Sequence, residues 1–197
     1  MPRMLDLYSG LGGASEAFVR AGWEVVRVEN NPLLENVPHT ILHDVRDHHV
    51  VFEDDYDFVW ASPPCTEFSN AYGGPKGVAY RSGVDFAPDL TLLNRALEII
   101  ELIKPKYWAI ENVAGASKIF SHTMKVNSPR QIIGPFFIWG IFPFVIVDYD
   151  WTHTKASQDV WSSDPLRANK KGKIPFEISR GFLNSITNQK QITEWIG

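Results

Sequence analysis

The stretch Asp6-Leu7-Tyr8-Ser9-Gly10-Leu11-Gly12-Gly13 decides the predicted fold of this chain. It joins a short apolar run, residues 4–8, to residues 14–21, whose composition suits a helix. In doubly wound α/β proteins such a turn binds ligands, because glycines let the backbone approach closely and the helix start presents free N–H groups. The glycines do not follow the G-x-G-x-x-G spacing of nicotinamide-binding proteins. The pattern therefore favours another nucleoside ligand, or a turn that needs glycine for its geometry alone.

Short apolar runs and helical patterns alternate along the rest of the chain. Strands are expected at residues 24–29, 40–43, 58–61, 107–111 and 144–149, and helices at 90–104 and from Pro175 onward. This alternation predicts an α/β fold with a mostly parallel sheet and helices on both faces. The glycine-rich residues 66–88 are expected to form an irregular loop that acts as a lid, and the lysine-rich residues 167–173 a surface loop.

Composition places the chain among ordinary globular proteins. Its 197 residues are 44% hydrophobic and 21% charged, so we expect residues 1–197 to form a single domain with a buried core. The apolar stretch 132–147 is interrupted by glycines and prolines and is shorter than a bilayer span, so no membrane association is expected. One cysteine excludes an intramolecular disulfide and a cysteine-based zinc site, and no metal is expected. We therefore expect a soluble, cytoplasmic protein.

Three further residues at predicted strand ends carry chemistry. Glu29 ends the second strand, at a distance from the glycine turn that suits an acid binding ribose hydroxyls. Cys65, in Ser62-Pro63-Pro64-Cys65, follows a strand that the prolines terminate, which makes it a candidate nucleophile rather than a small buried apolar residue. Glu111, in Glu111-Asn112-Val113, is either an acid in the same cleft or an ordinary surface glutamate.

Together these motifs resemble the cytosine-5 methyltransferase family over residues 4–113, in family order and at suitable spacing. The resemblance implies a Rossmann-like S-adenosylmethionine-dependent methyltransferase fold, with S-adenosyl-L-methionine as cofactor, Cys65 as catalytic nucleophile and Glu111 as catalytic acid. The implied cofactor-binding residues are Asp6, Tyr8, Ser9, Gly10, Gly12, Gly13, Glu29, Asn30, Asp44, Val45 and Pro63. The implied substrate-binding residues are Ser62, Pro64, Asn112, Lys76 and Arg81. An aromatic neighbour, Trp23 or Phe68, is expected to cover part of the cofactor.

The implied reaction is transfer of a methyl group to carbon 5 of cytosine in DNA. Cys65 adds to carbon 6 while Glu111 donates a proton to ring nitrogen 3, and carbon 5 then attacks the methyl group of S-adenosylmethionine. Loss of the carbon 5 proton to water and departure of Cys65 restore the ring. A cytosine inside a duplex must be flipped out to reach such a site. Lys76 and Arg81, in the expected lid, then contact phosphates, unless they are ordinary solvated loop charges.

The resemblance weakens after Val113. There is no clear Arg-x-Arg motif, and the remaining residues leave no room for a separate target recognition domain. Residues 182–186 resemble the family's terminal Gly-Asn-Ser motif without its glycine, whereas residues 134–140 and 173–177 resemble short phage-encoded members, which implies a bacterial or phage-infected host cell. We therefore expect target recognition to be degenerate or borrowed from a second subunit, with residues 167–173 contacting the DNA backbone.

Two alternatives stay open at this point. The same chemistry could act on RNA, single-stranded DNA or a cytidine nucleotide, which the net charge of −4 and the missing recognition domain favour. The chain could instead be a methyltransferase-like subunit that binds cofactor without turnover. The missing arginine motif favours that second alternative, and the intact Cys65 and Glu111 oppose it.

Overall fold

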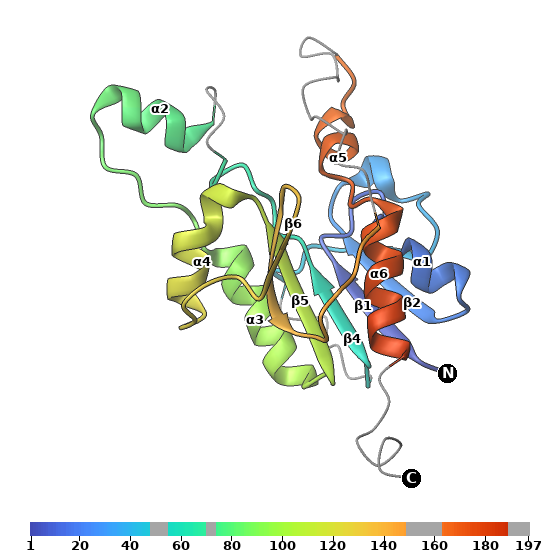
Figure 1. Ribbon diagram of the computed structural model, residues 1–197. Helices are drawn as coiled ribbons and strands as arrows, with labels where there is room; N and C mark the ends of the chain where they lie inside the picture. The colour runs from blue at the N-terminus through green and yellow to red at the C-terminus, as the bar shows by residue number, and fades with distance from the viewer. Residues whose placement is uncertain (48–54, 70–73, 149–162, 189–197) are drawn as a thin grey trace.

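The strands of the described part of the chain form one mixed sheet (Figure 1). The computed structural model describes residues 1–47, 55–69, 74–148 and 163–188. The strands are β1 (Arg3–Leu7), β2 (Glu24–Glu29), β3 (Thr40–Leu42), β4 (Phe58–Ala61), β5 (Tyr107–Asn112), β6 (Gln131–Ile133) and β7 (Phe136–Ile141). They lie in the order β3-β2-β1-β4-β5-β7-β6.

The strand order of the sheet reverses at β1, because the next two strands in the sequence lie on one side of β1 and the later strands lie on the other. Strand β1 pairs in parallel with β2 on one side and with β4 on the other, and β3 and β5 extend the parallel part outward. Strands β7 and β6 then add an antiparallel edge beside β5. The predicted mostly parallel sheet is confirmed. A parallel sheet whose strand order reverses has an open crevice at the carboxyl ends of the strands on either side of the reversal, here β1 and β4.

Helices cover both faces of the sheet, as predicted. They are α1 (Glu16–Arg20), α2 (Pro75–Ser82), α3 (Thr91–Ile103), α4 (Ser117–Thr123), α5 (Arg167–Gly172) and α6 (Phe176–Thr187), with short 3₁₀ turns η1 (Pro32–Leu34) and η2 (Ala114–Ala116). One face packs Val59 and its neighbours against α3 and α4, through Ile99 and Phe120. The opposite face packs Phe58 against α1 and α6, where the ring of Phe182 stacks on it at 5.8 Å between centroids.

The apolar spacing of the two long helices explains their position. In α3 the buried residues Leu93, Ala96 and Ile100 recur every three to four residues, so one stripe faces the sheet. In α6, Ile178 and Phe182 lie one turn apart and are fully buried. This burial is why α6, although far along the sequence, lies beside α1 in Figure 1.

Several sequence-based expectations about local structure were wrong. The expected irregular lid contains α2, which stands away from the sheet in Figure 1, and the expected lysine-rich surface loop forms α5. Residues 144–148 form no strand, and Tyr149 lies outside the described residues. The apolar run before them forms the β6–β7 hairpin instead, because Gly134 adopts a positive φ of 55° and turns the chain. In the described residues, no helix is long and apolar enough to cross a bilayer.

Candidate active site

The carboxyl ends of the five parallel strands surround one cavity of about 330 Å³. Asp44 follows β3, Glu29 ends β2, the glycine-rich turn follows β1, Cys65 follows β4 and Glu111 lies in β5. Neighbouring strands are about 4.8 Å apart, so the ends of β2 and β4, two strands apart, are separated by on the order of 10 Å along the edge. Strand order therefore sets the order of the chemical groups around the cavity.

Most of the residues expected to form the site line this cavity. They are Asp6, Tyr8, Ser9, Gly10, Gly13, Glu29, Asn30, Asp44, Val45, Ser62, Pro63, Pro64, Cys65 and Glu111. Gly12, Asn112, Lys76 and Arg81 are not part of its wall. The aromatic residues expected to cover the cofactor are also elsewhere, because Trp23 packs against Phe18 at 5.0 Å and Phe68 against Phe120 at 4.9 Å.

The glycine-rich turn is held open by its own backbone. Tyr8 and Gly10 adopt positive φ values of 59° and 53°, and Gly12 N–H closes the turn on the Ser9 carbonyl at 2.8 Å. The Tyr8 hydroxyl donates to the Leu92 carbonyl at 2.8 Å, and burial raises the pKa of this phenol. Tyr8 is therefore a neutral hydrogen-bond donor that fixes one wall of the cavity to the start of α3.

Glu29 organises the neighbouring loops through its carboxylate. Oε2 accepts the Gly10 N–H at 2.8 Å, and Oε1 accepts the N–H groups of Asn30 and Asn31, both at 3.0 Å. An ionised carboxylate offers about four acceptor sites, so three protein donors leave one site for a ligand hydroxyl. The side chain expected to bind ribose thus also positions the turn.

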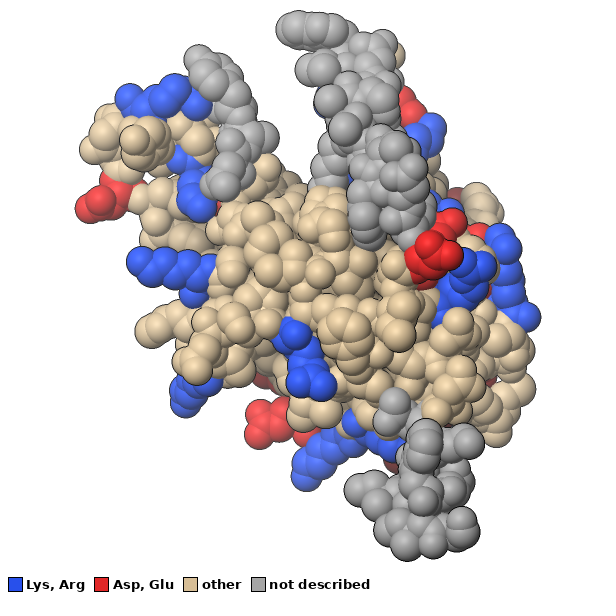
Figure 2. Space-filling model, viewed as in Figure 1, with Lys and Arg blue, Asp and Glu red and all other residues tan. Residues whose placement is uncertain are grey.

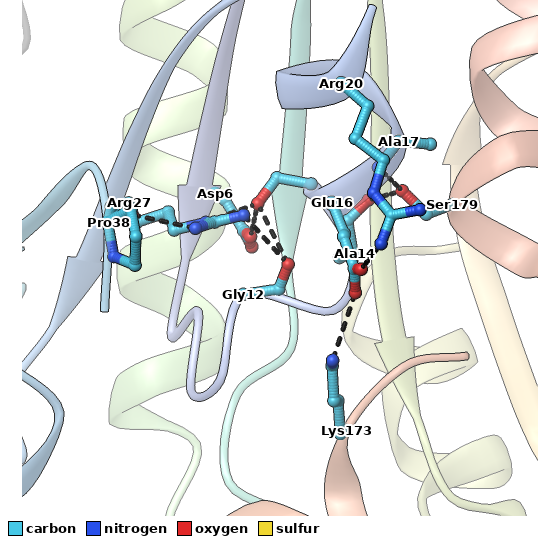
Figure 3. Close-up of polar contacts among 11 residues, drawn as sticks. Asp6, Gly12, Ala14, Glu16, Ala17, Arg20, Arg27, Pro38, Lys173 and Ser179 are labelled. Carbon is cyan, nitrogen blue, oxygen red and sulfur yellow. Dashed lines mark hydrogen bonds and ion pairs between the residues drawn. The ribbon is translucent and has the colours of Figure 1, made fainter. Parts of the chain in front are cut away.

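A buried polar network lies beneath the turn (Figure 3). The Arg27 guanidinium donates to Ser15 Oγ at 2.8 Å, to the Gly12 carbonyl at 3.1 Å and to the Pro38 carbonyl at 2.7 Å. The Ser15 hydroxyl donates to Asp6 Oδ2 at 2.6 Å. Burial raises the pKa of Asp6 to about 6, against the lowering effects of Ser15 and Arg27. Asp6 is 1% exposed, and its hydrogen bond to Ser15 supports the turn from below.

Asp44 forms an ion pair with Arg46. Arg46 Nε lies 3.0 Å from both Asp44 carboxylate oxygens, and this hydrogen-bonded pairing lowers the pKa of Asp44 to about 2. Both side chains line the cavity. A ligand amino group approaching Asp44 would share the carboxylate with Arg46.

At the other end of the cavity, buried side chains hold the loops that carry Cys65 and Glu111. Asn112, 1% exposed, donates through Nδ2 to the Pro63 carbonyl at 2.9 Å and so ties the end of β5 to the Pro-Pro-Cys segment. The Ser62 hydroxyl accepts the Trp60 indole N–H at 2.7 Å. Cys65 itself is exposed and lines the same cavity as Glu111. A residue with a thiol and a residue with a carboxyl thus line one open cleft.

The C-terminal part of the chain closes the cavity from the glycine side, which the sequence did not reveal. Residues 168, 169 and 172–174 of α5 and the α5–α6 connection form this wall. The approach is close, because a Cβ atom on Gly13 would lie 2.3 Å from the Ile174 carbonyl oxygen. Lys173 pairs with Glu16 at 3.0 Å and Lys170 with Asp164 at 2.5 Å. Asn169 Nδ2 would lie 3.7 Å from a Cβ on Gly10. Gly13, the last glycine of the turn, is therefore needed for packing, because a side chain there would collide with Ile174.

Two polar atoms of the cavity-lining residues suit a polar ligand. Ser9 Oγ and His43 Nε2 are buried and have no hydrogen-bond partner in the described structure. Buried polar atoms are costly unless they are paired, so a ligand group that engaged them would be stabilised. His43 was not predicted, and its only sequence signal is its place next to Asp44. The described residues contain no group of three His, Cys, Asp or Glu side chains that could hold a metal ion.

Comparisons with known proteins match most of this chain to one family. Residues 2–127 match the family model for C-5 cytosine-specific DNA methylases. A frog virus 3 protein named "Probable DNA (cytosine-5)-methyltransferase" is 33% identical over 117 residues, which cover 56% of this chain and 53% of that protein. The type II methyltransferase M1.HphI of Haemophilus parahaemolyticus is 30% identical over 137 residues, which cover 60% of this chain and 33% of that protein. The matches thus span about half of the first relative's length and a third of the second's.

Proposed function

Because this chain belongs to the C-5 cytosine-specific DNA methylase family, we propose that it transfers a methyl group to carbon 5 of cytosine in DNA. One observation carries the proposal. A single cavity contains the Glu29 end, which suits a nucleoside, and the Cys65–Glu111 end, which suits covalent chemistry on a base. The two ends of the cavity are two strands apart, so the methyl group of a donor bound at one end can approach a base bound at the other.

The methyl donor in this family is S-adenosylmethionine, which supplies an electrophilic methyl group when bound. The residues present fit it. The free acceptor site of Glu29 suits a ribose hydroxyl, and the unpartnered Ser9 Oγ suits a polar group of the amino acid portion. We place Asp44 and Val45 near the adenine, and Asn169 of α5 opposite Gly10, where its amide can bind the cofactor.

Cys65 and Glu111 would perform the chemistry on the base. Carbon 5 of cytosine is a poor nucleophile, and addition of the Cys65 thiolate to carbon 6 raises the electron density at carbon 5. Protonated Glu111 donates to ring nitrogen 3 and so neutralises the charge that the addition creates. After methylation, water accepts the carbon 5 proton, nitrogen 3 returns its proton to Glu111, and departure of the Cys65 thiolate restores the ring. Asn112 acts through the Pro63 carbonyl and is a positioning residue.

The charge of the chain bears on which cytosine-containing substrate it binds. The net charge of −4 is compatible with weak, phosphate-dependent binding of a duplex and also with single-stranded DNA, RNA or a free nucleotide. The ion pairs of Lys170 and Lys173 reduce the basic character expected for residues 167–173. We propose DNA, in agreement with the family, and treat the other substrates as arms of one experiment.

Transfer of tritiated methyl groups to duplex DNA, single-stranded DNA, tRNA and dCMP tests the proposal. We expect transfer to DNA, abolished in Cys65→Ser, and a covalent adduct with DNA containing 5-fluorocytosine, because fluorine blocks the final elimination. S-Adenosylhomocysteine should bind Cys65→Ser as tightly as the unmodified chain. Binding of S-adenosylhomocysteine without transfer to any substrate would favour the alternative of a cofactor-binding subunit.

A further inference from the structure

A second cavity, of about 450 Å³, adjoins the proposed active site, and we name it the lateral cavity. It is lined in part by the segments that follow Cys65 and Glu111. Glu67 and Phe68 lie two and three residues after Cys65, and Phe68 N–H donates to the Cys65 carbonyl at 3.0 Å. Gly115 likewise lies four residues after Glu111 and lines the lateral cavity. The two cavities are therefore neighbours at the ends of β4 and β5.

One wall of the lateral cavity is apolar and aromatic. Phe68, 4% exposed, forms the floor of the cavity together with Ile119 of α4. Phe86 and Pro88 contribute from the segment between α2 and α3, and Phe86 is only half-buried. Such a surface suits the face of a flat aromatic group, because a nucleobase that stacks on aromatic side chains needs no particular hydrogen-bonding edge.

Basic side chains line the same cavity. Lys76 of α2 lies on one side, where its Nζ donates to the Gly115 carbonyl at 3.3 Å. Lys118 and His122 lie one turn apart on α4, so they share a face of that helix. Figure 2 shows Lys and Arg side chains along α2 and beside α4, at the left of the view. Among the described residues that line the cavity, Glu67 is the one acidic residue. A ligand with an aromatic plane and a negative charge complements this surface.

We propose that the lateral cavity holds a nucleotide adjacent to the target cytosine in the same DNA strand. Its base lies against the apolar wall, and its phosphate lies near Lys76 and Lys118. The proposal rests on the proposed function, because only a strand whose cytosine enters the active site would place its next nucleotide here. The site would strengthen binding without selecting one base strongly, since every base has an aromatic face.

The test uses single-stranded oligonucleotides that contain one target cytosine and an abasic position on its 5′ or its 3′ side. An abasic position on the side that occupies the lateral cavity should raise the KM for the oligonucleotide about tenfold. Phe86→Ala should raise the KM for the intact oligonucleotide by a similar factor and have no further effect on the abasic one. Lys118→Ala should raise the KM for the intact oligonucleotide by a smaller factor and reduce the salt dependence of that KM.

Matched controls separate this site from a general loss of structure. Phe144→Ala removes an exposed ring elsewhere, and Lys106→Ala removes an exposed cation just before β5, at the amino ends of the parallel strands, so neither should change the KM. All variants should bind S-adenosylhomocysteine normally. Equal KM values for intact and abasic oligonucleotides, or a Phe86→Ala variant indistinguishable from Phe144→Ala, would overturn the proposal. Absence of any 5-fluorocytosine adduct would instead contradict the proposed function on which it rests.

Discussion

Gly12 and Arg27 compete for one space beneath the cofactor turn: a Cβ atom on Gly12 would lie 2.4 Å from Arg27 Cζ. The guanidinium cannot simply swing aside, because it donates to the Gly12 and Pro38 carbonyls and to Ser15. Gly12 does not line the cavity, so its place in the motif is explained by Arg27 and by its φ of +71°. The turn is thus shaped partly by a buried arginine.

This relationship predicts a non-additive pair of substitutions. Gly12→Ala should cost about 2–4 kcal/mol of unfolding free energy, from left-handed backbone strain and overpacking. Arg27→Met keeps the apolar stem but loses the hydrogen bonds, and it should weaken S-adenosylhomocysteine binding although Arg27 does not line the cavity. The double variant should lose less unfolding free energy than the sum of the two single losses, because the methionine that replaces Arg27 no longer places a guanidinium against the Cβ atom added at Gly12. Urea unfolding and calorimetry measure both quantities, and strictly additive costs would refute the conflict.

Glu29→Gln should weaken S-adenosylhomocysteine binding by about tenfold or more, because hydrogen bonds to a charged group contribute about 1.5–3 kcal/mol each. The amide would also present N–H groups toward the donors of Gly10 and Asn30. Glu24→Gln, at the start of the same strand and paired with Arg3 at 3.0 Å, is the matched control. Isothermal titration calorimetry compares the two. Similar affinities for both variants would show that Glu29 does not bind the ligand.

Asn169→Ala should lower S-adenosylhomocysteine affinity several-fold, by about 1 kcal/mol, because it removes a cavity-lining amide near the turn. Lys171→Ala is the control, as Lys171 belongs to the same helix but does not line the cavity. Thermal shifts with and without ligand measure the difference. Should Asn169→Ala keep full affinity, the C-terminal wall would be only a cover.

Stability should fall as pH rises through the pKa of Asp6. Its pKa is raised from 3.8 to about 6 in the folded chain, so the folded state binds the proton more tightly than the unfolded chain does. The associated stabilisation is complete below about pH 4 and is lost as pH rises through about 6, by about 3 kcal/mol at most. Asp6→Asn should remove this part of the pH profile, and exposed Asp85→Asn should leave it unchanged. Urea unfolding from pH 4 to 8 tests it, and parallel profiles for all three proteins would contradict it.

The sequence by itself determined the five parallel strands and the groups at their ends. Short apolar runs and the alternating residues 24–29 predicted β1 to β5, because burial leaves a local pattern in the sequence. Glu29, Cys65 and Glu111 were identified for the same reason, since each stands at the end of such a run. The edge hairpin β6–β7 was missed, because a continuous apolar run does not reveal where it turns.

Only the tertiary structure decided what surrounds those groups. The burial of Arg27, the close approach of Ile174 to Gly13 and the position of Asn169 over the turn join residues that are far apart in sequence. No local pattern encodes such contacts, because they depend on the order of strands in the sheet and on α6 packing beside α1. The residues that perform the proposed chemistry were therefore predictable from their strands, whereas the walls of their cavity follow from the three-dimensional packing of the chain.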